Sequence, residues 1–145
     1  MQNFPHTYHA GATAGPHGLV TLRSEGLRDL DSAPPAEFGG PGDEWSPETL
    51  LVAAVADCFL LTFRAIATAS KLEWTALECT VSGQLDRVER AVQFAAFELR
   101  AVLDLPPDAD AARAEKLLEK AKSNCFITNS LKASVTLVAE VRPAA

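Results

Sequence analysis

The sequence predicts an α+β fold, with an antiparallel β-sheet covered on one side by a layer of helices. Two segments, residues 77–86 and 92–103, alternate apolar and polar residues with the two-residue period of half-buried strands. A long apolar segment from Pro47 and an amphipathic segment after Pro107 have helical spacing. The predicted order is strand, strand, long loop, long helix, strand, strand, helix, short helix, strand.

The composition is that of one globular domain. The chain has 145 residues, of which 48% are hydrophobic and 22% charged, so a single soluble domain is expected over residues 1–145. The formal net charge is −6 without a basic patch, which argues against a nucleic-acid partner. The N-terminal residues lack the basic and apolar regions of a signal peptide, so a cytoplasmic location is expected.

The first 45 residues predict a hairpin and a loop. Residues 4–23 are expected to form a hairpin around the turn signal at 14–18. Residues 31–45 contain Pro34, Pro35 and a Gly-Gly-Pro-Gly run, so they are expected to lack regular structure. Loops of this length in compact domains are often functional.

A long helix is expected from Pro47 to about Ser70. Ser46 suits the N-cap, Pro47 the first helical position, and Glu48 places an acid in the first turn. One face is dominated by small residues, namely Leu51, Ala54, Val55, Cys58, Thr62 and Ala65.

The same helix is interpreted as a core helix. Asp57 and Arg64 leave its apolar run short of the roughly 20 residues of a membrane span, so no membrane partner is expected. The helix is apolar on more sides than one sheet face can cover, which suggests a partner subunit.

The C-terminal third predicts two helices and a closing strand. Pro106-Pro107-Asp108 is expected to end the second strand and start a helix, with the apolar face Ala111, Ala114, Leu117, Leu118 and Ala121. Continuing this spacing places Cys125 inward. Ser123 or Asn124 is expected to cap a short helix through Leu131, and residues 135–141 form the last strand.

The three cysteines are the candidates for chemistry. Cys58, Cys79 and Cys125 are too scattered for a disulfide framework or a zinc site. A thiolate can attack a peroxide and a second cysteine can resolve the sulfenic acid, but buried cysteines are also often inert. Cys79, on the apolar face of a strand, is interpreted as inert, and His6 and His9 face opposite sides of a strand, so no metal or other cofactor is expected.

Two local motifs carry a resemblance to a known family. Residues 46–59, SPETLLVAAVADCF, resemble the first signature of the OsmC/Ohr family (osmotically inducible protein C-like and organic hydroperoxide resistance proteins), and residues 124–131, NCFITNSL, resemble its second. The Phe38-Gly39-Gly40 loop and the order of elements also resemble the family, so the likeness covers nearly the whole chain. The expected fold is therefore a single OsmC-like domain, β-β-(loop)-α-β-β-α-α-β, in an intertwined homodimer.

The resemblance implies a thiol-dependent peroxidase of the oxidative-stress response that reduces organic hydroperoxides. Cys58 matches the peroxidatic cysteine, Cys125 the resolving cysteine and Glu48 the site carboxylate. A dithiol reductant, with a lipoyl-type dithiol as one option, would then reset the disulfide. An apolar wall of Leu51, Val55, Phe59 and Phe126 is expected to favour organic peroxides over hydrogen peroxide.

The sequence departs from the family at the site arginine. Ohr-type members carry it in the first hairpin turn, where this chain has Pro16, and OsmC-type members in the long loop, where residues 31–45 contain no arginine. His17, Arg23, Arg28 and Arg64 are candidates for a substitute cation. The alternative is therefore a non-catalytic family member that binds a small apolar ligand, or a dimer with structural thiols.

Two further questions stay open in the sequence. Ten residues of continuous helix span about 15 Å, so Glu48 and Cys58 of one chain should not touch without a partner subunit or a helix break. Helix-dipole reasoning favours Cys125 as the activated thiol, because it falls near the start of a short helix, whereas the family resemblance favours Cys58.

Overall fold

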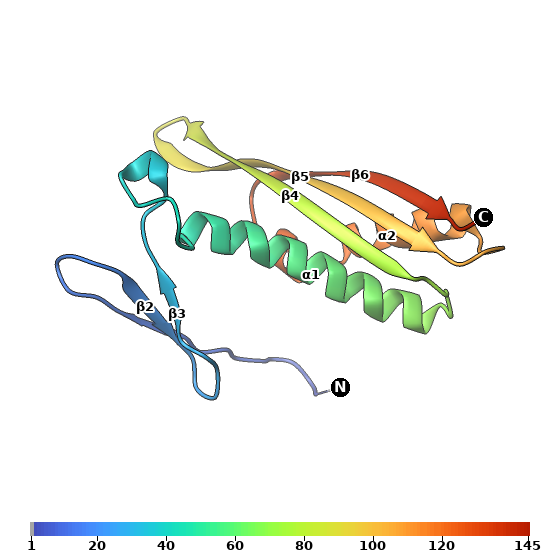
Figure 1. The fold of residues 1–145 in the computed structure, drawn as a ribbon, viewed down its shortest axis with the longest axis horizontal. Helices are drawn as coiled ribbons and strands as arrows, with labels where there is room; N and C mark the ends of the chain where they lie inside the picture. Colours follow the sequence, from blue (N-terminus) through green and yellow to red (C-terminus); the bar gives the residue numbers. More distant parts are fainter. Residues whose placement is uncertain (1) are drawn as a thin grey trace. The chain divides into compact units, whose positions relative to one another are not determined.

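The computed structural model describes residues 2–145. The chain divides into two compact units, of which the first ends at Leu50 and the second runs from Leu51 to Ala145. We describe each unit by itself (Figure 1). The single domain expected over residues 1–145 stays a prediction.

The first unit contains a small antiparallel sheet. Its strands, in the order β1-β2-β3, are β1 (Gly11–Thr13), β2 (Val20–Arg23) and β3 (Leu30–Ser32). The β1–β2 pairing confirms the predicted hairpin, with Ala12 opposite Leu22.

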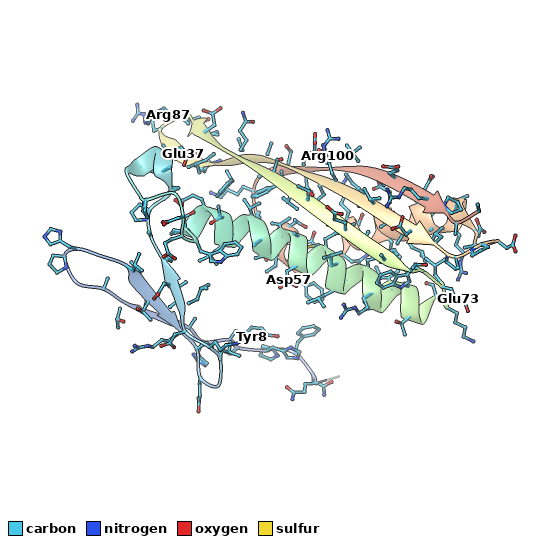
Figure 2. The ribbon with its side chains drawn as sticks, viewed as in Figure 1. Tyr8, Glu37, Asp57, Glu73, Arg87 and Arg100 are labelled. Atoms are coloured by element: carbon cyan, nitrogen blue, oxygen red, sulfur yellow. The ribbon has the colours of Figure 1, made fainter. Side chains whose placement is uncertain are left out.

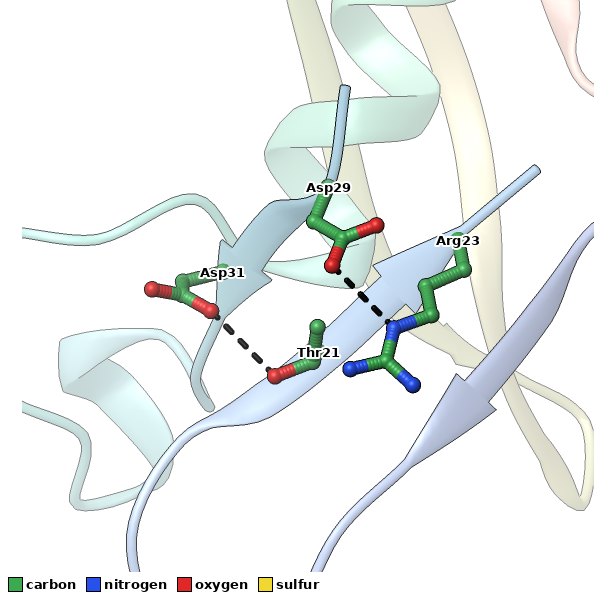
Figure 3. Close-up of polar contacts among 4 residues, drawn as sticks. All are labelled: Thr21, Arg23, Asp29 and Asp31. Carbon is green, nitrogen blue, oxygen red and sulfur yellow. Dashed lines mark hydrogen bonds and ion pairs between the residues drawn. The ribbon is translucent and has the colours of Figure 1, made fainter. Parts of the chain in front are cut away.

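The loop expected at residues 31–45 is partly ordered, which corrects the prediction. It contains the end of β3 and a 3-10 turn, η1 (Ala36–Phe38), and Ser32 forms an isolated bridge with Trp45. A three-residue strand is too short to show a period in sequence. Two side-chain contacts support the β2–β3 pairing: Arg23 with Asp29 at 3.1 Å, and Thr21 with Asp31 at 3.3 Å (Figure 3).

Helix α1 (Pro47–Ala69) has nearly the predicted bounds. The Ser46 hydroxyl accepts a hydrogen bond from the Thr49 backbone N–H at 3.1 Å, and the Thr49 hydroxyl accepts one from the Ser46 N–H at 2.8 Å. This reciprocal cap satisfies donors that the first turn leaves free.

The buried stripe of α1 differs from the predicted small-residue face. The fully buried residues are Val55, Phe59, Phe63 and Ala67, whereas Cys58 and Thr62 are partly buried and Ala65 is exposed. The helix is apolar enough for either side to face the core, and the side that carries the larger side chains does so. Burying each phenylalanine is worth about 2–3 kcal/mol relative to leaving it exposed.

By length and composition alone α1 could cross a membrane despite Asp57 and Arg64, a test that the core helix of a globular protein also passes. The expected core helix is supported by its buried residues, namely Val55, Phe59, Phe63 and Ala67. The helix has 23 residues, and an 18-residue window of mean hydropathy 2.0 is long and apolar enough to cross a membrane. Only 22% of that window is buried inside the structure. The other residues of that window are partly buried or exposed.

The second unit is built on a three-stranded sheet of order β4-β5-β6, with β4 (Ala76–Val88), β5 (Ala91–Leu105) and β6 (Ser134–Pro143). The β4–β5 pair is the predicted antiparallel hairpin, but β6 runs parallel to β5, with Leu99 opposite Leu137. The prediction of a wholly antiparallel sheet is therefore wrong for the β5–β6 pair. The two helices between β5 and β6 return the chain across the sheet, so β6 starts from the same end as β5.

The two later helices differ from prediction at their N-termini. Helix α2 (Ala111–Ser123) starts at Asp110, whose carboxylate accepts a hydrogen bond from the Arg113 N–H at 3.0 Å, and not at Pro106. Helix α3 (Phe126–Asn129) has Cys125 at its N-cap position, in place of Ser123 or Asn124. The Asn124 amide instead donates to the Lys120 carbonyl oxygen at 2.7 Å and closes α2.

The core of the second unit lies between the sheet and helices α1 and α2. Figure 1 shows α1 running along one face of the sheet, and Figure 2 shows Asp57 on the opposite side of that helix. Gly83 permits the close approach, because a Cβ there would lie 2.8 Å from Phe97 Cε1 and 2.9 Å from Val52 Cγ2. The buried sheet and α2 residues are Phe97, Leu99, Ala101, Leu103, Leu105, Ala114, Leu118 and Ala121. The α+β class is confirmed.

Candidate active site

Cys58 and Cys125 come together in the second unit. Cys58 lies in the middle of α1, and Cys125 lies in the turn between α2 and α3, where it is fully buried. Both thiols are free, and their side chains are hydrogen-bonded to each other. The inward orientation predicted for Cys125 is confirmed.

The surroundings of Cys58 favour its thiolate. Burial raises the pKa of Cys58, but hydrogen bonds from the Ile127 backbone N–H, the Cys125 thiol, the Thr62 hydroxyl and the Phe126 backbone N–H lower it, and the net pKa lies below the ordinary value. Hydrogen bonds to the charged form of a group stabilise that form. These donors are neutral, so they act through dipoles rather than through a net charge.

Cys125 has the opposite tendency. Burial raises the pKa of Cys125, hydrogen bonds with Thr128 lower it, and the hydrogen bond with Cys58 and the charge there raise it, so the net pKa lies above the ordinary value. The two directions are those of a pair in which the Cys125 thiol donates a hydrogen bond to Cys58 whenever Cys58 is ionised. The expectation from the helix dipole, which favoured Cys125 as the activated thiol, is opposite to this polarity.

Thr62 is a site residue that sequence reasoning placed on the helix face but did not single out. Its hydroxyl oxygen lies 3.8 Å from Cys58 Sγ, one helical turn away. The spacing Cys-x-x-x-Thr on a helix was the available signal, because residues four apart are neighbours on one face. The backbone N–H groups of Phe126 and Ile127 could not be assigned to the site without the position of α3.

Glu48 is not brought to Cys58 within the helix. It lies in the first turn of α1, which is unbroken from Pro47 to Ala69, so ten residues separate the two by about 15 Å. One of its carboxylate oxygens, Oε2, is buried and has no hydrogen-bond partner within residues 2–145.

The candidate cations occupy separate places. Arg23 is ion-paired with Asp29 in the first sheet, His17 is exposed in the hairpin turn, and Arg28 is exposed between β2 and β3. Arg64 is exposed on α1, in the same unit as Cys58. The main causes of the lowered Cys58 pKa include none of these four cations.

The four residues of the predicted apolar wall differ in exposure. Val55 and Phe59 are fully buried in the core, and Leu51 is partly buried against it. Phe126 is 71% exposed beside Cys125, and Leu61, three residues after Cys58, is 52% exposed. Phe126 follows Cys125 directly in the chain, and its backbone N–H is one of the hydrogen-bond donors to Cys58.

The remaining candidates have simpler environments. Burial, with a contribution from the charge of Cys125, raises the pKa of Cys79 to about 11. His6 Nε2 donates a hydrogen bond to the Gln2 backbone carbonyl oxygen at 3.0 Å, and its ring stacks on Phe4. Over residues 2–145 there is no group of three or more His, Cys, Asp or Glu side chains that could hold a metal ion.

A thiolate-favouring cysteine, hydrogen-bonded to a buried second thiol on an α+β scaffold, defines a protein with a dithiol site. The chain belongs to the OsmC family, because the model of OsmC-like proteins matches residues 40–140.

Named relatives and a solved structure agree. The chain is 31% identical over 109 residues to the uncharacterised protein YmaD of Bacillus subtilis, covering 73% of each chain. It is 30% identical to an organic hydroperoxide resistance protein of Xanthomonas axonopodis pv. citri, covering 90% of this chain and 89% of the relative. A crystal structure of an organic hydroperoxide resistance protein OsmC from Legionella pneumophila superposes with a TM-score of 0.75 at 28% identity, covering 97% and 99%.

Proposed function

We propose that this protein is a thiol peroxidase that reduces organic hydroperoxides in the cytoplasm, with Cys58 as the attacking thiol and Cys125 as the resolving thiol. The observation that carries the proposal is the meeting of Cys58, in the middle of α1, with the fully buried Cys125 at the start of α3. The pKa of Cys58 is lowered and that of Cys125 is raised, which agrees with these two roles. A thiolate is the nucleophile in this chemistry, and a neighbouring protonated thiol is the group that condenses with a sulfenic acid.

The first step oxidises Cys58. Its thiolate attacks the terminal oxygen of the hydroperoxide, a sulfur–oxygen bond forms and the oxygen–oxygen bond breaks. The alkoxide leaves and takes up a proton to become an alcohol, and Cys58 is left as a sulfenic acid.

The second step joins the two cysteines. The sulfur of Cys125 attacks the sulfenic sulfur of Cys58, a disulfide forms and water leaves. A dithiol reductant, such as a lipoyl-type dithiol, is then oxidised to its own disulfide and returns both cysteines to thiols. The pre-existing hydrogen bond between the side chains supports this order, because the resolving thiol is already at the reacting sulfur.

The substrate class follows from the exposed apolar side chains. Leu61, three residues after Cys58, and Phe126, directly after Cys125, are 52% and 71% exposed. An organic peroxide can bury an apolar tail against them, whereas hydrogen peroxide has no such group.

A homodimer is part of the proposal, with the chain acting as a single OsmC-like domain in each subunit. Most residues in the apolar window of α1 are not fully buried, and a second copy would cover what they expose. Because α1 is unbroken, Glu48 can reach a thiol pair only across a subunit boundary. Its unpartnered Oε2 supports such a role, since a buried carboxylate oxygen usually has a donor.

The decisive experiment measures what a peroxide does to the reduced protein. One equivalent of cumene hydroperoxide should remove two hydrogens from the intact mass and yield a peptide crosslinked between Cys58 and Cys125. Cys58→Ser should abolish peroxide consumption, whereas Cys79→Ser, the matched control, should retain it. Thiols that stay reduced would contradict the proposal and favour the alternative, a binder of a small apolar ligand without the site arginine.

A further inference from the structure

We propose that Thr62 is a catalytic residue of this site, because its hydroxyl touches the reacting atom and donates a hydrogen bond to the Cys58 thiolate. Thr62 Oγ1 lies 3.8 Å from Cys58 Sγ, within hydrogen-bonding range for sulfur. The inference rests on the proposed function and deepens it, since it names a group that activates the thiol in a chain with Pro16 at the position of the family's arginine.

The hydroxyl of Thr62 departs from the ordinary behaviour of threonine in a helix. A helical threonine commonly donates to the backbone carbonyl oxygen four residues earlier. Thr68, on the same helix, does so, with its hydroxyl 2.9 Å from the Arg64 carbonyl oxygen. The Thr62 hydroxyl instead has Cys58 Sγ as its hydrogen-bond partner, and within residues 2–145 it makes no other side-chain hydrogen bond.

Only one direction of this hydrogen bond is available once Cys58 ionises. A thiol can either donate or accept, but a thiolate can only accept, so Thr62 must then be the donor. A donor aimed at the charged form stabilises that form. The Thr62 hydroxyl, the Cys125 thiol and the backbone N–H groups of Phe126 and Ile127 together surround the sulfur with neutral donors.

The charged side chains on the segments around Cys58 are not among the groups that stabilise its thiolate. On α1 the nearest charged side chains, Asp57 and Arg64, are exposed, and Asp57 points away from the sheet (Figure 2). On the segment that carries Cys125, Lys122 is paired with Glu119 at 4.0 Å. Cys125 is the titratable group in direct contact with Cys58.

The experiment measures the rate at which iodoacetamide alkylates Cys58 as a function of pH, with peptide mass spectrometry to separate the three cysteines. Thr62→Val removes the hydroxyl at nearly constant volume and should raise the apparent pKa of Cys58, which slows alkylation at pH 7 about tenfold. Thr62→Ser keeps the hydroxyl and should restore the wild-type profile. Thr68→Val, the matched control, should leave the profile unchanged.

The outcomes separate this inference from the proposed function, because alkylation needs no peroxide. An unchanged profile in Thr62→Val, or an equal shift in Thr68→Val, would overturn the role of Thr62 even if the protein reduces peroxides. A shift in Thr62→Val that Thr62→Ser reverses supports it even if no peroxide is consumed. If Thr62→Val does not fold, Thr62→Ala compared with Thr62→Ser gives the same test.

Salt dependence gives an independent readout. Neutral donors are not screened, so raising sodium chloride from about 0.05 to about 0.5 M should leave the Cys58 profile in place. A profile that moves to higher pH with salt would point to a cation and overturn the description of the site as neutral.

Discussion

Cys125 donates a hydrogen bond to Cys58 from a fully buried position, and the two thiols have pKa values displaced in opposite directions. The pair is therefore polarised before any substrate arrives. The environment favours the thiolate at the partly buried Cys58 and the neutral thiol at the buried Cys125.

The resolving role proposed for Cys125 predicts a trapped intermediate. In Cys125→Ser the serine hydroxyl can still donate to Cys58, so the first oxidation by cumene hydroperoxide should proceed at near the wild-type rate. The sulfenic acid then has no thiol partner and should be captured by dimedone on Cys58. Excess peroxide should carry it on to sulfinic acid. A disulfide that forms at the wild-type rate in this variant would contradict the assignment.

The three pKa directions predict an order of thiol reactivity. The pKa of Cys79 is about 11, three units above pH 8, so at pH 8 about one molecule in a thousand carries the Cys79 thiolate. Cys58 should react fastest with iodoacetamide, and Cys79 and Cys125 more slowly. Burial disfavours the Cys79 thiolate, so this thiolate forms only at high pH. Raising the pH toward 11 should therefore steadily increase the rate at which Cys79 is alkylated. Quantitative peptide mapping over this pH range would show the order.

The two exposed apolar side chains predict substrate preference. Phe126→Ala and Leu61→Ala remove apolar surface beside the thiols without touching the buried core. Each should raise KM for cumene hydroperoxide several-fold, since burying a side chain of this size is worth about 1–3 kcal/mol. Activity toward hydrogen peroxide should stay the same. Val138→Ala, an exposed change on β6, is the control that should affect neither substrate.

The close approach of α1 to the sheet predicts a strong effect at Gly83. Its Cβ would lie 2.8 Å from Phe97 and 2.9 Å from Val52, so Gly83→Ala should lower the free energy of unfolding by about 1–3 kcal/mol. Gly11→Ala, also in a strand, places its Cβ in open space and should change stability by less than about 0.5 kcal/mol. Denaturant unfolding of both variants would test this, and equal effects would argue against the packing.

Much of the fold could be predicted because its signals are local. The start of α1 follows from Ser46 and Pro47, which act within one turn, and β4 and β5 follow from strict alternation. The direction of β6 could not be predicted, because it depends on how α2 and α3 cross the sheet. Strand β3 could not be predicted because it depends on pairing with β2. The N-cap at Cys125 could not be predicted because neighbouring residues compete for that position.

The site, like the fold, has parts that local sequence predicts and parts that require the three-dimensional structure. The cysteines were found through their motifs, and their pairing agrees with the inward position of Cys125 on the α2 period. The buried stripe of α1 could not be predicted, because a helix that is apolar on most sides does not reveal which side the core takes. Val55 and Phe59 went inward, and Leu61 was left outside. The hydrogen-bond donors from Thr62, Phe126 and Ile127 could not be predicted, because they depend on how α1 and α3 are placed together.

The parallel pairing of β5 with β6 has a consequence for the order in which the molecule assembles. The β4–β5 hairpin joins neighbours in the chain, whereas β6 pairs with residues 38 positions earlier, as between Ala96 and Ser134. Non-local pairings form later, because the chain between them must be ordered first. Cys125 lies on that intervening crossover, so its meeting with Cys58 belongs to the last, least local stage of folding. Amides of α3 and β6 should accordingly exchange with solvent hydrogen sooner than those of the hairpin.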